Sequence, residues 1–519
     1  MPKQADVAAQ AEQSEVNRLS ALDTTPWYKK PNLRFLYLCL IPAAMGVEMT
    51  TGYDGSVLNG LQAVQAWQDH FGNPKGALLG VTTASYNLGG LLVLPIVPYM
   101  VDKIGRRHSI SLGSVILIVG TILQTCSVNI AMFLASRLIL GTGIPFAVSG
   151  ASQLMAELAH PRERPVLSGL FNVSWFVGAI LAAGITLGTY NIPNNWAWRI
   201  PSALQCAPSL LQLIFIWFIP ESPRWLLFKE RNQEALEVLI KYHGEGDPDS
   251  AFVHAEYNEI SHQLRQELSS SKRRWSELLQ TAGNRKRILI AMCMGLFSQW
   301  SGNGLVSYYL ARVLKTVGVQ DRRTQNIVNL SLSCWSMLTA GTFAFLPRVL
   351  RRRVQYLTSF CLMVVVFAII TAVSAHYAIS GGHAAAVAVV AMIFVYNASY
   401  NITQPLLYVY ITEIFPFVHR AKGIAILQFF VRGSTAFNAF VNPIGLDALA
   451  WKFYIFYCVW LAVETTIIYF LYPETKGPTL EKLAYLFEER PKEIEYQDAE
   501  DDTKVDNEKD MRPVVKETA

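Results

Sequence analysis

The chain contains apolar blocks that are too long for the core of a soluble domain. Twelve blocks carry few charges and cover residues 34–58, 77–101, 109–128, 130–155, 166–189, 200–219, 287–313, 325–347, 354–378, 384–411, 421–445 and 451–472. About 20 apolar residues in a helix cross a hydrocarbon core of ~30 Å. The sequence lacks the short alternating segments that barrel strands need. It therefore predicts an all-α membrane protein with twelve transmembrane helices.

Composition excludes a chain made only of soluble domains. The 519 residues would suffice for two or three such domains, but 52% are hydrophobic and only 16% are charged. The first 32 residues are polar and of mixed charge, without the apolar core and cleavage site of a signal peptide. We therefore expect the first apolar block to remain as a membrane span.

Basic residues in the loops predict the orientation in the membrane. With both termini inside, the inner loops 102–108, 160–165, 348–353 and 419–422 hold eleven Lys and Arg, and the outer loops hold about six. Cytoplasmic loops usually carry the excess of Lys and Arg. The sequence therefore predicts that both termini are cytoplasmic, and we expect the plasma membrane as the location.

The apolar blocks and the charged stretches between them divide the chain into five parts. A cytoplasmic tail covers 1–32, six-helix halves cover 33–220 and 287–473, a charged linker covers 221–286, and a C-terminal segment with an acidic disordered tail covers 474–519. In the linker, Val253, Tyr257, Ile260, Leu264 and Leu268 recur at helical spacing. We predict a cytoplasmic helical linker domain. A module that binds another protein is the alternative.

Charged features recur in the same order in both halves. Residues Asp102–Arg107 correspond to Pro347–Arg352, Glu157 and Arg164 to Glu413 and Arg420, and Pro220-Glu221 to Pro473-Glu474. The offsets are 245, 256, 256 and 253 residues. The sequence therefore predicts two parallel repeats, an architecture that binds its substrate between the halves near the bilayer midplane.

The recurring charges lie at the inner ends of the predicted helices. They are Asp102, Arg106, Arg107, Glu157, Arg164, Glu221 and Arg224 in the first half, and Arg351, Arg352, Glu413, Arg420 and Glu474 in the second. We predict that they form a charge latch whose ion pairs hold the two halves together at the inner face in one conformation and break in another. The alternative is that they only set topology and meet lipid headgroups.

Asp54 and Arg137 are charges inside predicted spans. A charge at bilayer depth costs roughly 2.5–3.5 kcal/mol and usually marks a functional site. Counted along their helices, the two residues lie at similar depth, so each could relieve the burial of the other. A carboxylate that can change its protonation state there would suit a proton-coupled carrier. A static structural pair is the alternative. Glu464 is another acid within a span, and its partner is not predicted.

Polar side chains scattered through the spans predict a neutral, hydroxyl-rich ligand. Amides donate and accept hydrogen bonds, and aromatic rings cover the C–H face of such a molecule. Any single amide can instead form an interhelical hydrogen bond. The candidate binding residues are Asn172, Gln299, Asn303, Asn329, Tyr408 and Asn438.

Motifs for other functions are missing from the sequence. It has no phosphate-binding loop of the type used by ATP-driven pumps, no metal-ligand spacing and no pairing of a nucleophile with a base. We expect no enzyme activity, no cofactor, no metal and no nucleic-acid partner. The expected partners are a sugar, protons and the lipid bilayer.

The motifs together resemble those of the sugar porters of the major facilitator superfamily. The matching stretches are GYDGSVLNG, DKIGRR, SRLILGTG, ELAHPRER, PESPRWLL, SGNGLVSYY, TEIFPFVHRAKG and PETKGPTLE, from residue 52 to 481. FNVSWFVGAI, NWAWRIPSALQ and FNAFVNPIGLDALAWKFYIFYCVW are similar to the fungal lactose-permease-like and hexose-transporter-like branch. The resemblance implies alternating access to a sugar or polyol by a monomer.

The resemblance also implies roles for particular residues. Asp54 corresponds to the proton acceptor of the family's symporters and Arg137 to its partner, and the sugar ligands correspond to Asn172, Gln299, Asn329 and Tyr408. Asn172 stands where many members have Gln, Gly304 where many have Asn, and Tyr408 where Trp is common. The substrate can therefore differ from a hexose.

Four functions follow from this reading. The leading hypothesis is a secondary carrier of a mono- or disaccharide, driven by protons through Asp54. The alternatives are an uncoupled sugar facilitator, a diverged carrier or exporter of a non-sugar metabolite, and a nutrient sensor that signals through its tails.

Overall fold

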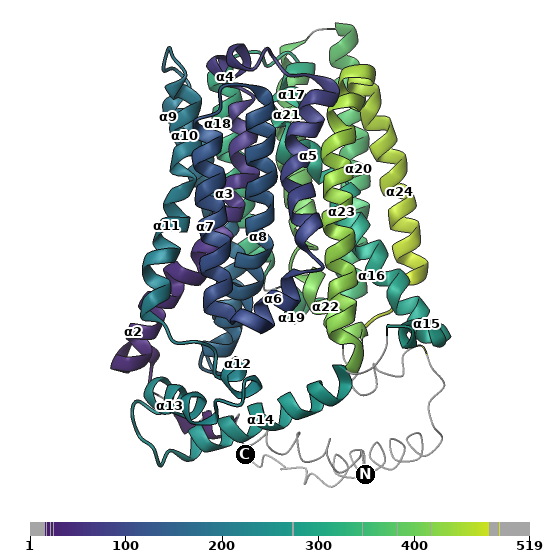
Figure 1. Cartoon of the computed structure of the whole chain (residues 1–519). Helices are drawn as coiled ribbons and strands as arrows, with labels where there is room; N and C mark the ends of the chain where they lie inside the picture. The colour runs from purple at the N-terminus through teal and green to yellow at the C-terminus, as the bar shows by residue number, and fades with distance from the viewer. Residues whose placement is uncertain are drawn as a thin grey trace, which may run out of the picture.

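The computed structural model describes residues 16, 18–20, 22–23, 25–271, 275–344, 346–380, 382–415, 417–476 and 487. Most of the predicted N-terminal tail and nearly all of the predicted acidic tail lie outside these residues. The described residues form helices joined by short loops (Figure 1).

The first half contains six membrane-crossing helices, several of them broken into two segments. They are α2 (Pro31–Leu40), η2 (Ile41–Met45) and α3 (Gly46–Leu61); α5 (Gly76–Val93) and α6 (Val97–Ile104); α7 (Arg106–Thr125); α8 (Ile130–Leu158); α9 (Arg164–Thr189); and α10 (Trp196–Leu204), α11 (Cys206–Phe215) and η3 (Ile216–Phe218).

The second half repeats this arrangement. Its segments are α16 (Ala282–Trp300) and α17 (Asn303–Thr316); α18 (Arg322–Phe343) and the short α19 (Leu346–Val349); α20 (Arg352–Ser380); α21 (His383–Asn401) and α22 (Leu406–Ile414); α23 (Phe417–Leu449); and η4 (Ala450–Lys452) and α24 (Phe453–Leu471). The prediction of an all-α membrane protein of twelve spans in two halves is confirmed.

Helix length and hydropathy alone identify nine candidate spans among the described residues. One of these, Lys422–Leu471, contains both α23 and α24. The segment formed by α16 and α17 and the helix α18 are not among the nine; α16 begins with the charges Arg285, Lys286 and Arg287, and α18 carries polar residues such as Asn326 and Asn329. Interrupted and polar helices are tolerated in a membrane where they face protein or a cavity.

The linker forms a helical cap at one end of the molecule, which we call the linker end. It consists of α12 (Pro223–Phe228), α13 (Asn232–Tyr242), α14 (Ala251–Ser271) and α15 (Glu277–Gln280) (Figure 1). Tyr257, Ile260 and Leu264 of α14 pack on a small core around Trp225 and Ala235. The apolar residues that recur at helical spacing in this stretch therefore form the face of α14 that packs on the rest of the linker.

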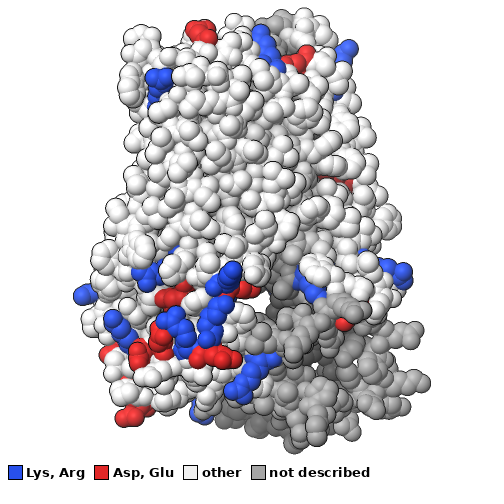
Figure 2. Space-filling view, viewed as in Figure 1, with Lys and Arg blue, Asp and Glu red and all other residues white. Residues whose placement is uncertain are grey.

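The opposite end, which carries the short α4 (Gln65–His70), is called the distal end (Figure 1). On the face seen in Figure 2, Lys, Arg, Asp and Glu gather near the two ends, and the broad band between them is almost free of charge. Such a band is what a hydrocarbon core requires of the surface in contact with it.

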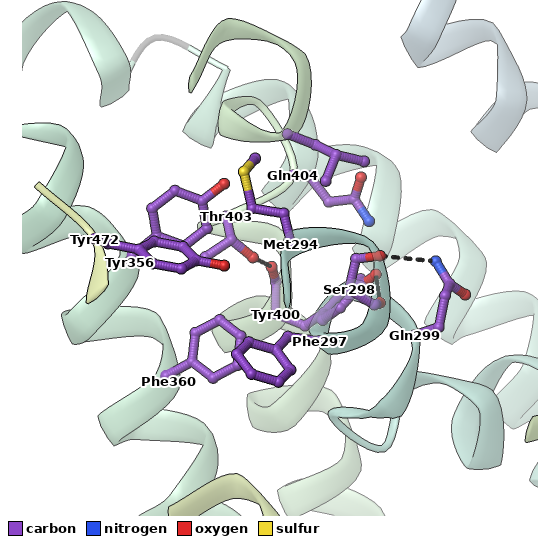
Figure 3. Close-up of a pocket in the computed structure, with 11 residues that line it drawn as sticks. Met294, Phe297, Ser298, Gln299, Tyr356, Phe360, Tyr400, Thr403, Gln404 and Tyr472 are labelled. Carbon is purple, nitrogen blue, oxygen red and sulfur yellow. Dashed lines mark hydrogen bonds between the residues drawn. The ribbon is translucent and has the colours of Figure 1, made fainter. Parts of the chain in front are cut away.

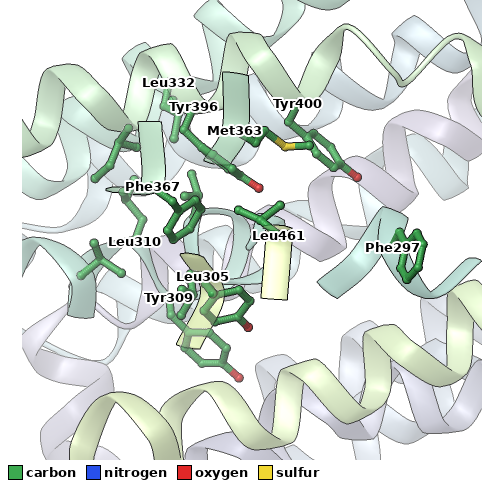
Figure 4. Packing of buried hydrophobic residues seen from close by; sticks show 14 of the residues in the cluster. Phe297, Leu305, Tyr309, Leu310, Leu332, Met363, Phe367, Tyr396, Tyr400 and Leu461 are labelled. Atoms are coloured by element: carbon green, nitrogen blue, oxygen red, sulfur yellow. The ribbon is translucent and has the colours of Figure 1, made fainter. Parts of the chain in front are cut away.

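Two hydrophobic clusters organise the interior. The larger one joins both halves, because it contains Tyr53 and Trp198 of the first half together with Phe297 and Tyr309 of the second. Figure 4 shows the part of this cluster that lies in the second half. There the rings of Phe367 and Tyr396 pack edge to face, with their centroids 5.0 Å apart. The other cluster lies at the linker end of the first half.

Small residues allow α3 and α9 to touch. A Cβ on Gly52 would lie 1.9 Å from the carbonyl oxygen of Trp175, and a Cβ on Gly178 would lie 1.9 Å from that of Met49. Membrane helices associate through such close backbone approach because hydrophobicity gives no driving force between them in lipid. The contact holds Asp54 of α3 firmly against the rest of the first half.

Candidate functional site

Asp54 and Arg137 share one buried site in the first half. Asp54 is 0% exposed and Arg137 is 2% exposed. They lie within electrostatic range of each other. Neither carboxylate oxygen of Asp54, and neither Nε nor Nη1 of Arg137, has a hydrogen-bond partner among the described residues. The structure therefore places the predicted pair together without joining it directly.

Tyr86 of α5 completes this site, and the sequence analysis missed it. The guanidinium of Arg137 lies 5.1 Å from the centre of the Tyr86 ring, a cation–π contact that partly compensates for its burial. The Tyr86 hydroxyl is buried and has no hydrogen-bond partner among the described residues. Polar atoms of three side chains, Asp54, Arg137 and Tyr86, can therefore form hydrogen bonds with one another after a small movement, and the carboxylate can bind a proton.

A pocket opens in the second half where two helices are broken. In this conformation its cavity volume is about 80 Å³. Gln299 lies just before the break between α16 and α17, and Thr403 and Gln404 lie in the break between α21 and α22 (Figure 3). The lining residues are Met294, Phe297, Ser298, Gln299, Tyr356, Phe360, Tyr400, Thr403, Gln404, Leu407 and Tyr472.

Gly302 causes the first break. Its φ of +100° is left-handed, which favours glycine and ends α16 at Trp300. The last carbonyls of a helix have no partner within it. Side chains supply the partners here: Tyr400 donates to the Ser298 oxygen at 2.7 Å, and Tyr396 donates to the Ser301 oxygen at 3.1 Å.

Asn438 has a similar capping role. Its Nδ2 donates to the Gln299 carbonyl at 2.8 Å, and its Oδ1 accepts from the Tyr457 hydroxyl at 2.8 Å. A Cβ on Gly304 would lie 2.3 Å from Asn438 Nδ2, so the amide of Asn438 fills the space that a side chain at 304 would need. Asn438 supports the pocket wall instead of lining the pocket.

The other predicted ligands lie in different surroundings. Asn303 donates to the Tyr400 hydroxyl at 3.3 Å. Asn329 accepts from Asn59 of the first half at 2.9 Å. Asn172 is exposed on α9, and Tyr408 is 42% exposed on α22. Of the predicted set, only Gln299 is a lining residue of the pocket in the second half.

The predicted charge latch of the first half is built around Glu221. Glu221 accepts from the backbone N–H groups of Arg106 and Arg107, at 3.1 Å and 3.2 Å, where α7 begins. Burial raises the pKa of Glu221 and these hydrogen bonds oppose the rise. Arg106 also pairs with Glu157 at 3.3 Å and with Asp102 at 3.4 Å. Gly105, with φ +96°, makes this approach possible.

The second half repeats these contacts, with a shift in register. Glu474 accepts from the N–H groups of Arg352 at 2.9 Å and Arg353 at 3.2 Å, and Arg352 pairs with Glu413 at 3.0 Å. Arg352 is therefore the counterpart of Arg106, one residue later than the sequence comparison predicted. Arg353, which the prediction omitted, is the counterpart of Arg107. The exposed Arg351 makes neither the Glu474 nor the Glu413 contact.

Hydroxyl groups extend the repeated arrangement. Ser222 donates to Glu157 in the first half, and Thr475 donates to Glu413 at 2.6 Å in the second. These pairs all lie within one half. The described contacts therefore brace each half internally and do not bridge the halves at the linker end.

Three residues of the predicted latch have other positions. Arg164 faces Glu256 of the linker at 3.6 Å, and Arg224 is half-buried on α12. The side chain of Arg420 lies outside the described residues.

The halves are bridged at the distal end. Asp447 accepts from the Gly76 N–H at 2.6 Å, and Arg312 donates to the Pro74 carbonyl at 3.1 Å. Gln62 donates to the Tyr308 carbonyl at 2.9 Å, and the Asn59–Asn329 hydrogen bond lies deeper in the same interface. Among the described residues, the hydrogen bonds between the halves are at this end, so the distal side is closed.

A buried cluster attaches the linker to the first half. His243 at the end of α13 contacts Glu256 of α14 at 2.6 Å and the Leu158 carbonyl of α8 at 3.2 Å. Burial alone lowers the pKa of His243, but Glu256 reverses this and leaves the pKa raised. Burial and the neighbouring His243 lower the pKa of His160 to about 4. The linker thus depends on a charged His–Glu pair.

Three further charges lie inside the spans. Glu464 of α24 is 0% exposed, and neither of its oxygens has a hydrogen-bond partner among the described residues. Glu48 of α3 and Arg432 of α23 were not predicted as site residues. Their signal was present in the sequence, because each is a charge within a predicted apolar block. Where the structure describes the chain, no group of His, Cys, Asp and Glu could hold a metal.

Comparison with known proteins gives a consistent result. The model of the family "Sugar (and other) transporter" matches residues 38–487. The MFS-type transporter oryC of Aspergillus oryzae is 30% identical, over 85% of this chain and 83% of its own. A high-affinity glucose transporter of Kluyveromyces lactis is 26% identical, over 88% of this chain and 86% of its own.

Solved structures show the same fold. The inward open xylose transporter XylE of E. coli superposes with a TM-score of 0.73 at 22% identity, over 87% of this chain and 100% of its own. A second structure of XylE, bound to 6-bromo-6-deoxy-D-glucose, describes it as a proton:xylose symporter of the major facilitator superfamily.

Proposed function

The chain belongs to the sugar (and other) transporter family, and from this premise we propose that it is a secondary transporter of a mono- or disaccharide. It is a multi-pass membrane protein. The pocket at the two broken helices is the observation that carries the proposal. Its amides, Gln299 and Gln404, can exchange hydrogen bonds with hydroxyl groups, and its rings, among them Tyr356 and Phe360, can cover an apolar face.

Alternating access follows from the asymmetry of the contacts between the halves. The distal end is closed by hydrogen bonds such as Asn59–Asn329, and the linker end is braced within each half. Rocking one half against the other would break the distal contacts and admit substrate from that side. In the arrangement described here, substrate would leave towards the linker end.

The site of Asp54 and Arg137 supports proton coupling. A buried carboxylate without a direct partner can bind a proton when its distance from the cation grows, and can release it when the cation approaches. Tyr86 lies on α5, which packs on α23 of the second half, so rocking of the halves would change the packing of the helix that carries Tyr86. We propose that protonation of Asp54 accompanies substrate binding.

Orientation and location are proposed from the charge distribution. The linker end carries most of the inner-loop arginines, so we place it and both termini in the cytoplasm. We place the protein in the plasma membrane, as a monomer.

Uptake into proteoliposomes tests the proposed function. Purified protein would be reconstituted and offered labelled glucose, lactose, cellobiose, xylose and glycerol in turn, with the unlabelled others as competitors. We expect uptake that saturates and is reduced by at least one sugar. The variant Gln299→Leu, which keeps the volume but removes the amide, should reduce it on the order of tenfold. Absence of saturable uptake for every sugar in the panel would contradict the proposal.

A further inference from the structure

Glu48 and Arg432 are opposite charges that the two halves present to each other inside the membrane. Glu48 lies on α3, six residues before Asp54 and so roughly 9 Å along the helix from it. Arg432 lies on α23 of the second half. Each is within electrostatic range of the other. Neither makes a hydrogen bond or a contact ion pair with a described residue, and Nε of Arg432 is buried without a partner.

The guanidinium of Arg432 reaches across the interface between the halves. Its Nη1 lies 3.2 Å from the position that a Cβ on Gly90 would occupy, and the ring of Pro145 is 3.5 Å from the same point. Gly90 is on α5 and Pro145 is on α8, both in the first half. The absence of a side chain at 90 therefore leaves the space that the guanidinium uses.

Tyr408 shows that this region borders an open space. Its hydroxyl accepts a hydrogen bond from Gln428 of α23, and both Glu48 and Arg432 lie within its electrostatic range. Tyr408 is nevertheless 42% exposed. Glu48 and Arg432 are themselves partly exposed, so this region is accessible from outside the packed interior.

The chemistry of these side chains limits what can bind. A guanidinium in a largely desolvated position is stabilised by an anion, and its planar donors match a carboxylate in a bidentate arrangement. Arg432 is a single cation, and Glu48 opposes it, so the pair carries no net charge. A monoanionic carboxylate can bind Arg432 without adding net charge when Glu48 takes up a proton, whereas a phosphate dianion would leave the site with an uncompensated negative charge.

We propose that the transported molecule is a sugar acid, a hydroxylated molecule of monosaccharide size with one carboxylate, and that Arg432 binds this carboxylate. Ionised Glu48 balances Arg432 in the empty site; when the substrate carboxylate binds Arg432, Glu48 is protonated, so the site stays neutral. This inference rests on the proposed transport function and narrows its substrate class.

Two substrates that differ only at one carbon test the inference. D-Glucose and D-glucuronate have the same ring, but glucose carries a hydroxymethyl group where glucuronate carries a carboxylate. Uptake of each would be measured in proteoliposomes for the wild type, Arg432→Gln, Arg432→Lys and Glu48→Gln, with size-exclusion chromatography as a check on folding. The wild type should prefer glucuronate.

The variants should change this preference in opposite directions. Arg432→Gln should reduce glucuronate uptake on the order of tenfold and change glucose uptake by less than about threefold, because a charged hydrogen-bond partner is lost. Arg432→Lys should keep part of the preference, since the charge remains and the bidentate geometry does not. Glu48→Gln should increase the preference for glucuronate, because a repelling carboxylate is removed.

The contradicting results separate this inference from the proposed function. Uptake of glucose with no uptake of glucuronate by the wild type would overturn the sugar-acid inference and leave sugar transport intact. An equal loss of both substrates in a folded Arg432→Gln would also overturn it, because that is the effect of a purely structural residue. Failure of the wild type to take up either substrate would contradict the proposed function itself. Should Arg432→Gln not fold, the ratio of glucuronate to glucose uptake in Glu48→Gln decides the question. A ratio higher than in the wild type supports the inference, and an unchanged or lower ratio contradicts it.

Discussion

Asp54 and Arg137 lie in the same buried site without touching each other. The carboxylate and the guanidinium influence each other electrostatically, yet no ion-pair contact joins them, and Tyr86 and Gln205 are the polar side chains beside the carboxylate. A tight buried pair would be static, because removing either partner is costly. A separated pair can gain or lose a proton with a small movement, which is why we place the proton at Asp54.

The repeated ion pair at the linker end of the second half predicts a difference between two adjacent arginines. Arg352→Gln should lower the free energy of unfolding by about 1–3 kcal/mol, because it leaves the part-buried Glu413 without its cation. Arg351→Gln should change it by less than about 0.5 kcal/mol, because Arg351 is exposed.

Thermal unfolding of the two variants in detergent provides the comparison, and Arg351→Gln is the matched control for loss of one positive charge. Equal destabilisation by both substitutions would show that net charge at this loop matters and that the specific Arg352–Glu413 contact does not.

The turn before α7 predicts a second contrast, between two glycines of the first half. At Gly105 the φ is +96°, and an added Cβ would lie 2.3 Å from Glu221 Oε2. Gly105→Ala should therefore destabilise the protein by about 1–3 kcal/mol. Gly169 in α9 has open space around it, so Gly169→Ala should be neutral or stabilising by up to about 1 kcal/mol. Melting temperatures measure both, and a neutral Gly105→Ala would show that the Glu221 contact is not required.

The cluster at His243 predicts how the attachment of the linker depends on pH. The folded-state pKa of His243 is raised above 6.5 because Glu256 is 2.6 Å away. A raised pKa stabilises the folded state fully below pH 6.5, and this stabilisation is lost as the pH rises through the folded-state value. The charges that face His243 are Glu256, Arg164 and, when protonated, His160.

Amide exchange of α14, corrected for the intrinsic effect of pH, checks this prediction. Protection of α14 should fall as the pH rises above 6.5 in the wild type, and the fall should be absent in His243→Gln. A fall of the same size in the variant would assign the pH dependence to another group.

The repeat illustrates what the sequence could and could not predict. The spacing from Glu157 to Arg164 equals the spacing from Glu413 to Arg420, and this equality was enough to find the two halves. The run Arg351–Arg353 could not be aligned by charge, since its three members are equivalent in sequence. The helix start decides the register: α7 begins at Arg106 and α20 at Arg352, and the free N–H groups of each start bind a glutamate.

The binding region was harder to predict. The spans 287–313 and 384–411 read as continuous apolar blocks, and their breaks depend on the left-handed Gly302 and on the turn before Pro405. Glu48 and Arg432 belong to different halves, so their proximity comes from tertiary packing that no local pattern contains. The role of Asn438 as a cap for the Gln299 carbonyl is equally non-local.

Uptake driven by an imposed pH gradient, compared between the wild type and Asp54→Asn, tests the central claim most directly. One proton moved per substrate through a gradient of two pH units supports up to about 100-fold accumulation. We expect the wild type to accumulate substrate when the outside is acidic, and Asp54→Asn to exchange substrate without accumulating it. Uptake by the wild type that ignores the gradient, or accumulation that persists in Asp54→Asn, would contradict proton coupling through Asp54.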